Sequence, residues 1–168
     1  MELKKFFLEQ LNREGTASRK TLERVPEGQN NWKPHERSME LGYLAALVAT
    51  MPGWLALMIE RDELDLDDSA GRTFRTREVQ TRSELLGMLE EALAKSTAAL
   101  NSTTEEHLMK GWRLVMGGQV LTEGPRYEMI ADGALSHMAH HRGQLTVYLR
   151  LNEAKVPAIY GPSADERF

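Results

Sequence analysis

Residues 133–152 read GALSHMAHHRGQLTVYLRLN and hold three of the five histidines of the chain, at positions 137, 140 and 141. Helical spacing of ~100° per residue places one group of residues on a common stripe, namely Ile130, Ala134, Leu145 and Tyr148. His137 and His141 lie ~20° either side of the line from Ile130 to Tyr148, whereas His140 lies ~80° away. We therefore expect a helix from Pro125 to about Asn152 whose His137–His141 pair faces the core.

A histidine pair at positions i and i+4 is compatible with two kinds of role. It brings both imidazoles to one point, which is how one helix supplies two ligands to Zn²⁺ or a similar divalent ion. A buried pair can equally be structural, with its ring nitrogens hydrogen-bonded to neighbours. Most metal sites need at least a third protein ligand, and the residues beside the pair do not identify one. The spacing alone leaves both roles open.

Three further helices are expected upstream of this stretch. Apolar residues at helical spacing predict helices over residues 3–24 and 39–60, and Pro52 should kink or interrupt the second. Thr81 and Glu84 form a capping-box pattern that opens a third helix, which runs to about Asn101. The sequence therefore predicts a mainly α protein, folded as a single domain over residues 1–168.

The segments between the helices differ in character. Apolar runs on either side of Gly117-Gly118 predict a small β-hairpin. Residues 61–80 are acidic and then basic without an apolar period, which is typical of a long surface loop. The tail after Asn152 contains Pro157 and Pro162 and should be extended.

Composition excludes several classes of function. The formal net charge is -4, and no run of Lys or Arg is present that could follow a phosphate backbone, so we expect no nucleic-acid partner. The chain has no cysteine, which rules out disulfides, thiolate ligands and a cysteine nucleophile. No stretch has the length and apolar character of a signal peptide or a membrane span, so we expect a cytoplasmic protein that does not bind membranes.

Three stretches of the chain together resemble one protein family. They are NNWKPHERSMELGYLAALVATMPGW (30–54), WRLVMGGQVL (112–121) and HMAHHRGQLTVYLRLNEAKVPAIYGPSADE (137–166). They are similar to the DinB-like superfamily of bacterial proteins, and the similarity covers nearly the whole chain. It implies an up-down-down-up four-helix bundle with a small β-hairpin before the last helix and an extended C-terminal tail. It also implies a homodimer and a divalent metal, nickel or zinc, held by three histidines.

Two of the three family histidines come from the H-x-x-x-H of the last helix, and His137 and His141 match them. The third lies in the second helix, and its equivalent here is Leu47. Leucine has no ligating atom, so the site is partly degenerate and should bind its metal weakly or not at all. No other side chain is an obvious replacement for this third ligand. This holds for side chains near Leu47 or the pair and for two carboxylates of the tail, namely Glu40, Tyr43, His140, Asp165 and Glu166.

The family resemblance implies metal-dependent thiol S-transfer as an ancestral activity, with a thiol or another small molecule as substrate. The side chains that we expect to support ligands or orient substrate are His140, Arg142, Gln144, Tyr43, Leu47 and Trp54. The alternative is a non-catalytic dimeric bundle that binds a small apolar molecule, or a stress-associated structural protein. In that case Leu47 makes the cavity apolar, and its further lining would be Tyr43, Met51, Trp54 and Met58. The sequence leaves open whether the protein is an enzyme.

Overall fold

The computed structural model describes residues 2–67, 79 and 81–167, and it is mainly helical. The long helices are α1 (Leu3–Leu22), α2 (Leu41–Thr50), α5 (Arg82–Ser102) and α8 (His137–Leu151). A 3₁₀ turn (Met51–Gly53) separates α2 from α3 (Trp54–Glu60). Two short segments, α7 (Arg126–Met129) and a π-helical stretch (Ile130–Ser136), lead into α8. The predicted helices are thus confirmed, with the last one less regular than expected.

Local sequence explains where α5 begins and where α2 ends. Thr81 Oγ1 accepts a hydrogen bond from the Glu84 N–H at 3.2 Å, and Glu84 Oε2 accepts one from the Thr81 N–H at 2.9 Å. This reciprocal capping box starts α5 as predicted. Pro52 lies in the 3₁₀ turn, because a proline cannot donate the backbone hydrogen bond that would continue α2.

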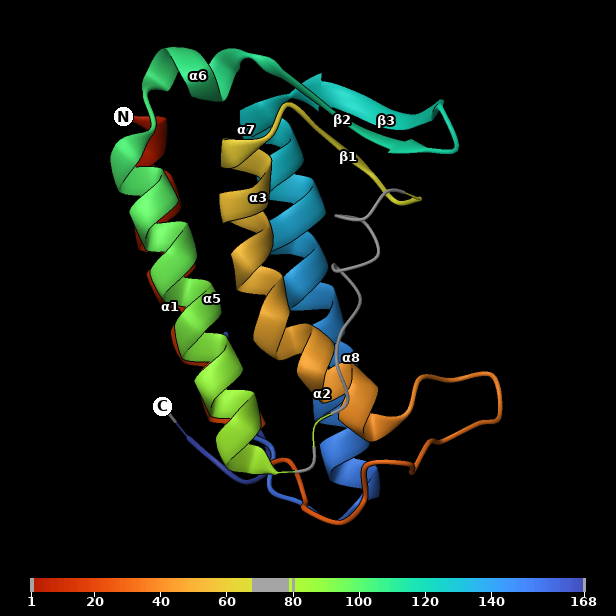
Figure 1. Ribbon diagram of the computed structural model, residues 1–168. Coiled ribbons are helices and arrows are strands. Elements are labelled where there is room, and N and C mark those ends of the chain that lie inside the picture. The colour runs from red at the N-terminus through yellow and green to blue at the C-terminus, as the bar shows by residue number, and fades with distance from the viewer. Residues whose placement is uncertain (1, 68–78, 80, 168) are drawn as a thin grey trace.

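The helices lie side by side in one layered body, with α5 packed against α1, α2 and α3. In Figure 1, α1 and α8 run in one direction, whereas α2, α3 and α5 run in the other. Two groups of buried apolar side chains fill the space between them. One is centred on residues such as Phe7, Leu55 and Met138, and the other on residues such as Leu44, Leu89 and Leu149.

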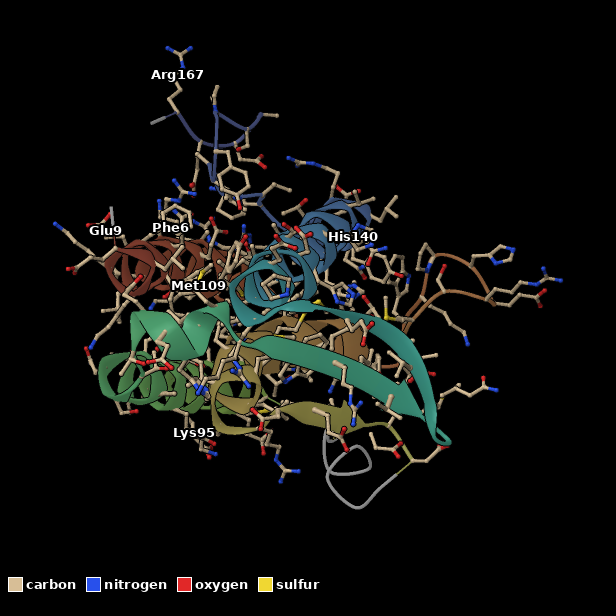
Figure 2. The ribbon with its side chains drawn as sticks, turned by 90° about the horizontal axis from the view of Figure 1, so that it is seen from above. Phe6, Glu9, Lys95, Met109, His140 and Arg167 are labelled. Atoms are coloured by element: carbon tan, nitrogen blue, oxygen red, sulfur yellow. The ribbon has the colours of Figure 1, made fainter. Side chains whose placement is uncertain are left out.

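A three-stranded sheet lies across one end of the helices (Figures 1 and 2). The predicted hairpin is confirmed as β2 (Gly111–Met116) and β3 (Gln119–Pro125), with Gly117 and Gly118 at positive φ in the turn. The third strand, β1 (Glu63–Asp65), pairs parallel with β2. A further short helix, α6 (Glu105–Met109), precedes the hairpin.

The prediction of an uninterrupted loop over residues 61–80 was therefore wrong for residues 63–65. A three-residue strand carries too little alternation to be recognised, since only Leu64 is apolar and buried. Pairing with β2, about fifty residues later in the chain, supplies its hydrogen bonds. Residues 68–78 and 80, which belong to the same predicted loop, lie outside the described residues.

Arg126 joins the sheet end of the molecule to α3. Its fully buried guanidinium donates from Nε to the Met58 carbonyl at 2.7 Å and from Nη1 to the His107 carbonyl at 2.9 Å. Nη2 donates to the Asp62 carboxylate at 2.5 Å. Met58 is in the last turn of α3, where carbonyls lack partners within the helix. Arg126 therefore acts as a C-terminal cap from another segment.

A second buried arginine, Arg142, joins α8 to α1. Its Nη2 donates to Glu14 Oε2 at 2.5 Å, and its Nη1 donates to Ser18 Oγ at 3.2 Å. The side chains of Arg142 and Glu14 are 1% and 6% exposed, so both charges are removed from water. Tyr160 in the tail also donates its hydroxyl to Glu14 Oε2, at 2.5 Å. The first helix, the last helix and the tail thus meet at one ion pair.

The C-terminal tail forms no helix or strand over its described residues 153–167, in agreement with the prediction. It folds back over the end of the helices opposite the sheet (Figure 1). Arg150 holds Asp165, whose carboxylate also accepts from the Val156 N–H, and Arg24 holds Glu166. The carboxylates of Asp165 and Glu166 are therefore occupied by contacts that hold the tail in place.

One helical stretch, residues 41–60, is long and apolar enough to span a membrane, so the prediction that no stretch has this length and apolar character was wrong. In the structure 67% of its apolar window is buried against the rest of the chain. Its apolar composition is explained by its place in the core, because it contributes side chains to both of the buried apolar groups described above.

Replacing Arg142 by methionine should lower the free energy of unfolding by about 3 kcal/mol, because Glu14 would remain a buried carboxylate whose partners are the exposed Arg13 guanidinium and the Tyr160 hydroxyl. The control is Arg150→Met on the same helix, which removes an ion pair on the surface and should cost much less, because solvent screens exposed charges. Urea denaturation followed by circular dichroism measures both. Equal losses in the two variants would contradict the buried network.

Acid should destabilise the fold partly through Glu14. Burial alone would raise the pKa of Glu14, but hydrogen bonds from Tyr160 and Arg142 and the charges of Arg142 and Arg13 outweigh it and hold that pKa below its ordinary 4.5. The stability due to Glu14 is therefore present above pH 4.5 and is lost as the pH falls through the lower, folded-state pKa. The unfolding free energy of the Glu14→Leu/Arg142→Met double variant should decline less steeply below pH 4.5 than that of the wild type. Parallel curves would show that Glu14 contributes nothing.

Candidate functional site

His137 and His141 converge as the i, i+4 spacing predicts. Their Nε2 atoms are 3.0 Å apart, and their ring centroids are 4.6 Å apart. The pair is not in the core, however, because His137 is exposed and His141 is only half-buried. The expectation of an inward-facing pair was therefore wrong, although the two imidazoles do meet.

The buried stripe of the last helix differs from the predicted one. The residues that are at most 1% exposed along α8 are Met138, Arg142, Leu145 and Leu149. At ~100° per residue these four lie within ~60° of one another, and His137 lies ~100° from Met138. The predicted stripe did not include Arg142, because a charged residue is expected at the surface. It was therefore centred on Tyr148, which lies at the edge of the observed stripe. The π-helical residues 130–136 also make Ile130 an unreliable reference for a wheel drawn at 3.6 residues per turn.

His141 is held by a third side chain of the same helix. Its Nδ1 lies 2.8 Å from Gln144 Oε1, three residues later. Burial lowers the pKa of His141 below its ordinary value, and the neighbouring His137 and His140 lower it further, against an opposing effect of the Gln144 hydrogen bond. The neutral imidazole is therefore favoured at this position.

Two other aromatic rings border the pair. The Trp54 indole meets the His137 ring edge-on, with centroids 5.4 Å apart. The His140 ring lies 5.1 Å from the His141 ring but is exposed, and Figure 2 shows this residue at the periphery of the last helix. The structure thus brings together His137, His140, His141, Gln144 and Trp54 from the predicted set.

The remaining predicted residues lie elsewhere. Arg142 points into the core toward Glu14, so it is not beside the imidazoles. Leu47 is half-buried and packs with Trp54 against the first apolar group, while Tyr43 is 46% exposed. Met51 and Met58, which were considered as lining for an apolar cavity, are core residues at 0% and 5% exposure.

The residues present match two of the three ligands of a three-histidine site. Two nitrogens bound to one tetrahedral Zn²⁺ at ~2.0–2.1 Å would be ~3.3 Å apart, close to the observed 3.0 Å. Within the described parts of the chain, however, no group of three His, Cys, Asp or Glu side chains is placed to share an ion. Leu47 does not fit the third position, and no chemical step can be assigned to a metal here.

A separate groove of about 960 Å³ lies at the sheet end of the molecule. Its walls come from the segment after α3 and from the strands, and its lining includes Arg61, Asp65, Lys110, Trp112 and Glu123. It contains none of the three clustered histidines. This groove is therefore distinct from the imidazole pair.

Sequence reasoning named Gln144 only as a general candidate and missed its specific contact with His141. The i, i+3 spacing was visible in the chain and is one that allows side chains to meet on a helix. The partners of Arg142 were missed for a different reason, since Glu14 and Ser18 lie 128 and 124 residues away. No local pattern connects them.

Comparison with known proteins agrees with the fold described above. The structure is similar to the crystal structure of a DinB-like protein (YjoA) from Bacillus subtilis, with a TM-score of 0.64 and 21% sequence identity. The match covers 89% of this chain and 94% of that one, and at this identity it shows the fold alone. No match was found among curated proteins. A model of the DinB family matches residues 1–167, and the chain therefore belongs to the DinB family.

Proposed function

We propose that this DinB-family protein carries a low-affinity site for a divalent ion, nickel or zinc, formed by His137 and His141. The observation that supports it is the convergence of the two Nε2 atoms to 3.0 Å on one helix. Imidazole nitrogen is a ligand that suits both ions. In this proposal the helices form an up-down-down-up four-helix bundle, and the pair lies beside α3, since Trp54 of α3 contacts His137.

The low affinity follows from Leu47. This side chain stands where the family resemblance implies the third histidine, and it packs among apolar neighbours instead. A site with two protein ligands must complete its coordination with water or with atoms of a bound molecule, which weakens binding. Thiol S-transfer is part of the proposal and requires the bound ion. No residue of the chain is given a role in a step of that reaction.

The proposal includes a homodimer in the cytoplasm. Val147 and Leu151 are 57% and 54% exposed, and their i, i+4 spacing puts them on one face of α8. Tyr43 of the neighbouring α2 is also exposed, at 46%. These three large apolar side chains are candidates for a contact between two copies.

Leu47→His should raise the affinity for Zn²⁺ or Ni²⁺ by at least ~100-fold, because even outer-shell partners of a metal site contribute 10–100-fold. His137→Ala should abolish binding, whereas His35→Ala, which removes an exposed histidine of a surface loop, should leave it unchanged. Isothermal titration calorimetry measures all three against the wild type. Equal metal affinity in the His137→Ala variant and the wild type would refute the site.

If α8 forms the contact between copies, Val147→Lys/Leu151→Lys should convert a dimer to a monomer, because buried charges at an interface are unfavourable. Sedimentation equilibrium gives the mass directly. Met116→Lys/Val120→Lys is the matched control, since it places the same charges on exposed apolar residues of the hairpin. A monomeric wild type would exclude the proposed dimer.

A further inference from the structure

A chain of hydrogen bonds through Gln144, His141 and His137 determines where the imidazole protons lie. Gln144 Oε1 is 2.8 Å from His141 Nδ1. An amide oxygen can only accept, so His141 Nδ1 must carry the hydrogen. A neutral imidazole has one N–H, and the Nε2 of His141 is therefore an unprotonated nitrogen with a free lone pair.

The contact between the two histidines then has one direction. The Nε2 atoms are 3.0 Å apart, which is a normal hydrogen-bond distance. Two lone pairs at this distance would repel, so one of the nitrogens must donate. Because His141 Nε2 is the acceptor, His137 Nε2 must be the donor. The two histidines consequently hold opposite tautomers.

We propose that Gln144 is a positioning residue that fixes His141 as the Nδ1–H tautomer and, through it, His137 as the Nε2–H tautomer. Gln144 is half-buried, and it lies three residues from His141, so the contact is built into α8 itself. A ligating histidine is commonly oriented by an acceptor on its other ring nitrogen. Gln144 therefore presents the His141 Nε2 lone pair toward His137.

The arrangement has a consequence for ligand binding that rests on the proposed metal function. The residues that would hold such an ion are His137 and His141, and in the proposed arrangement the Nε2 of His137 carries a hydrogen whereas the Nε2 of His141 does not. His141 would need no change, because Gln144 already holds it in the form that a ligand requires. The two histidines are thus unequal, with His141 prepared for ligation and His137 not.

Nuclear magnetic resonance of the full chain, labelled with ¹⁵N-histidine and stripped of metal by a chelator, tests the tautomers directly. Long-range ¹H–¹⁵N spectra should show Nδ1–H for His141 and Nε2–H for His137. In Gln144→Leu, which removes the acceptor, His141 should lose the Nδ1–H form. Gln144→Glu should retain it, because a carboxylate also accepts.

Thr146→Val is the matched control, since it removes a polar side chain of α8 whose hydroxyl donates to the Gly143 carbonyl. It should leave both tautomers unchanged. An Nε2–H tautomer of His141 in the wild type, or an unaltered Nδ1–H tautomer in Gln144→Leu, would overturn the proposal. The wild-type spectrum decides the first point even if a variant fails to fold.

A zinc titration of the same samples separates this inference from the proposed function. Gln144→Leu should bind Zn²⁺ about 10–100-fold more weakly than the wild type, as expected for loss of a partner that orients a ligand. If the wild type binds no zinc while the predicted tautomers are observed, the proposed metal function fails and the role of Gln144 stands. If zinc binds but His141 is the Nε2–H tautomer, the role of Gln144 fails and the metal function stands.

Discussion

The buried ion pair between Glu14 and Arg142 is the constraint on which the arrangement of the last helix depends. Both side chains are almost fully removed from water, and breaking such a pair leaves one charge without compensation. Arg142 must therefore point toward α1, and that requirement sets the rotation of α8 about its own axis. The buried side chains Met138, Leu145 and Leu149 lie on the same face of α8 as Arg142.

The position of the histidines follows from that rotation. With Arg142 directed inward, His141 precedes it by ~100° around the helix and emerges half-buried at the edge of the core. His137, one turn earlier, is exposed on the same side and meets Trp54 of α3. A buried arginine thus moves the imidazole pair to the surface of the helical body, where a ligand can reach it.

The same ion pair links the tail to the core. Tyr160 donates to Glu14, and its ring lies 5.3 Å from the Arg142 guanidinium. Hydrogen bonds from Arg150 and from the Val156 N–H keep the pKa of Asp165 below its ordinary value. Hydrogen bonds from the Ala158 N–H and from Arg24 do the same for the pKa of Glu166. The carboxylates of Asp165 and Glu166 therefore hold the tail in place, and neither replaces the ligand that Leu47 lacks.

The sequence by itself determined the helices, the Thr81 capping box, the glycine hairpin, the family and the meeting of His137 with His141. All of these depend on residues close together in the chain, where spacing and local chemistry suffice. Only the tertiary structure decided that Arg142 is core, that β1 pairs with β2, and that the histidines face outward. Those outcomes depend on partners that are distant in the chain, such as Glu14 for Arg142, and a helical wheel counts a charged residue as exposed until its buried partner is known.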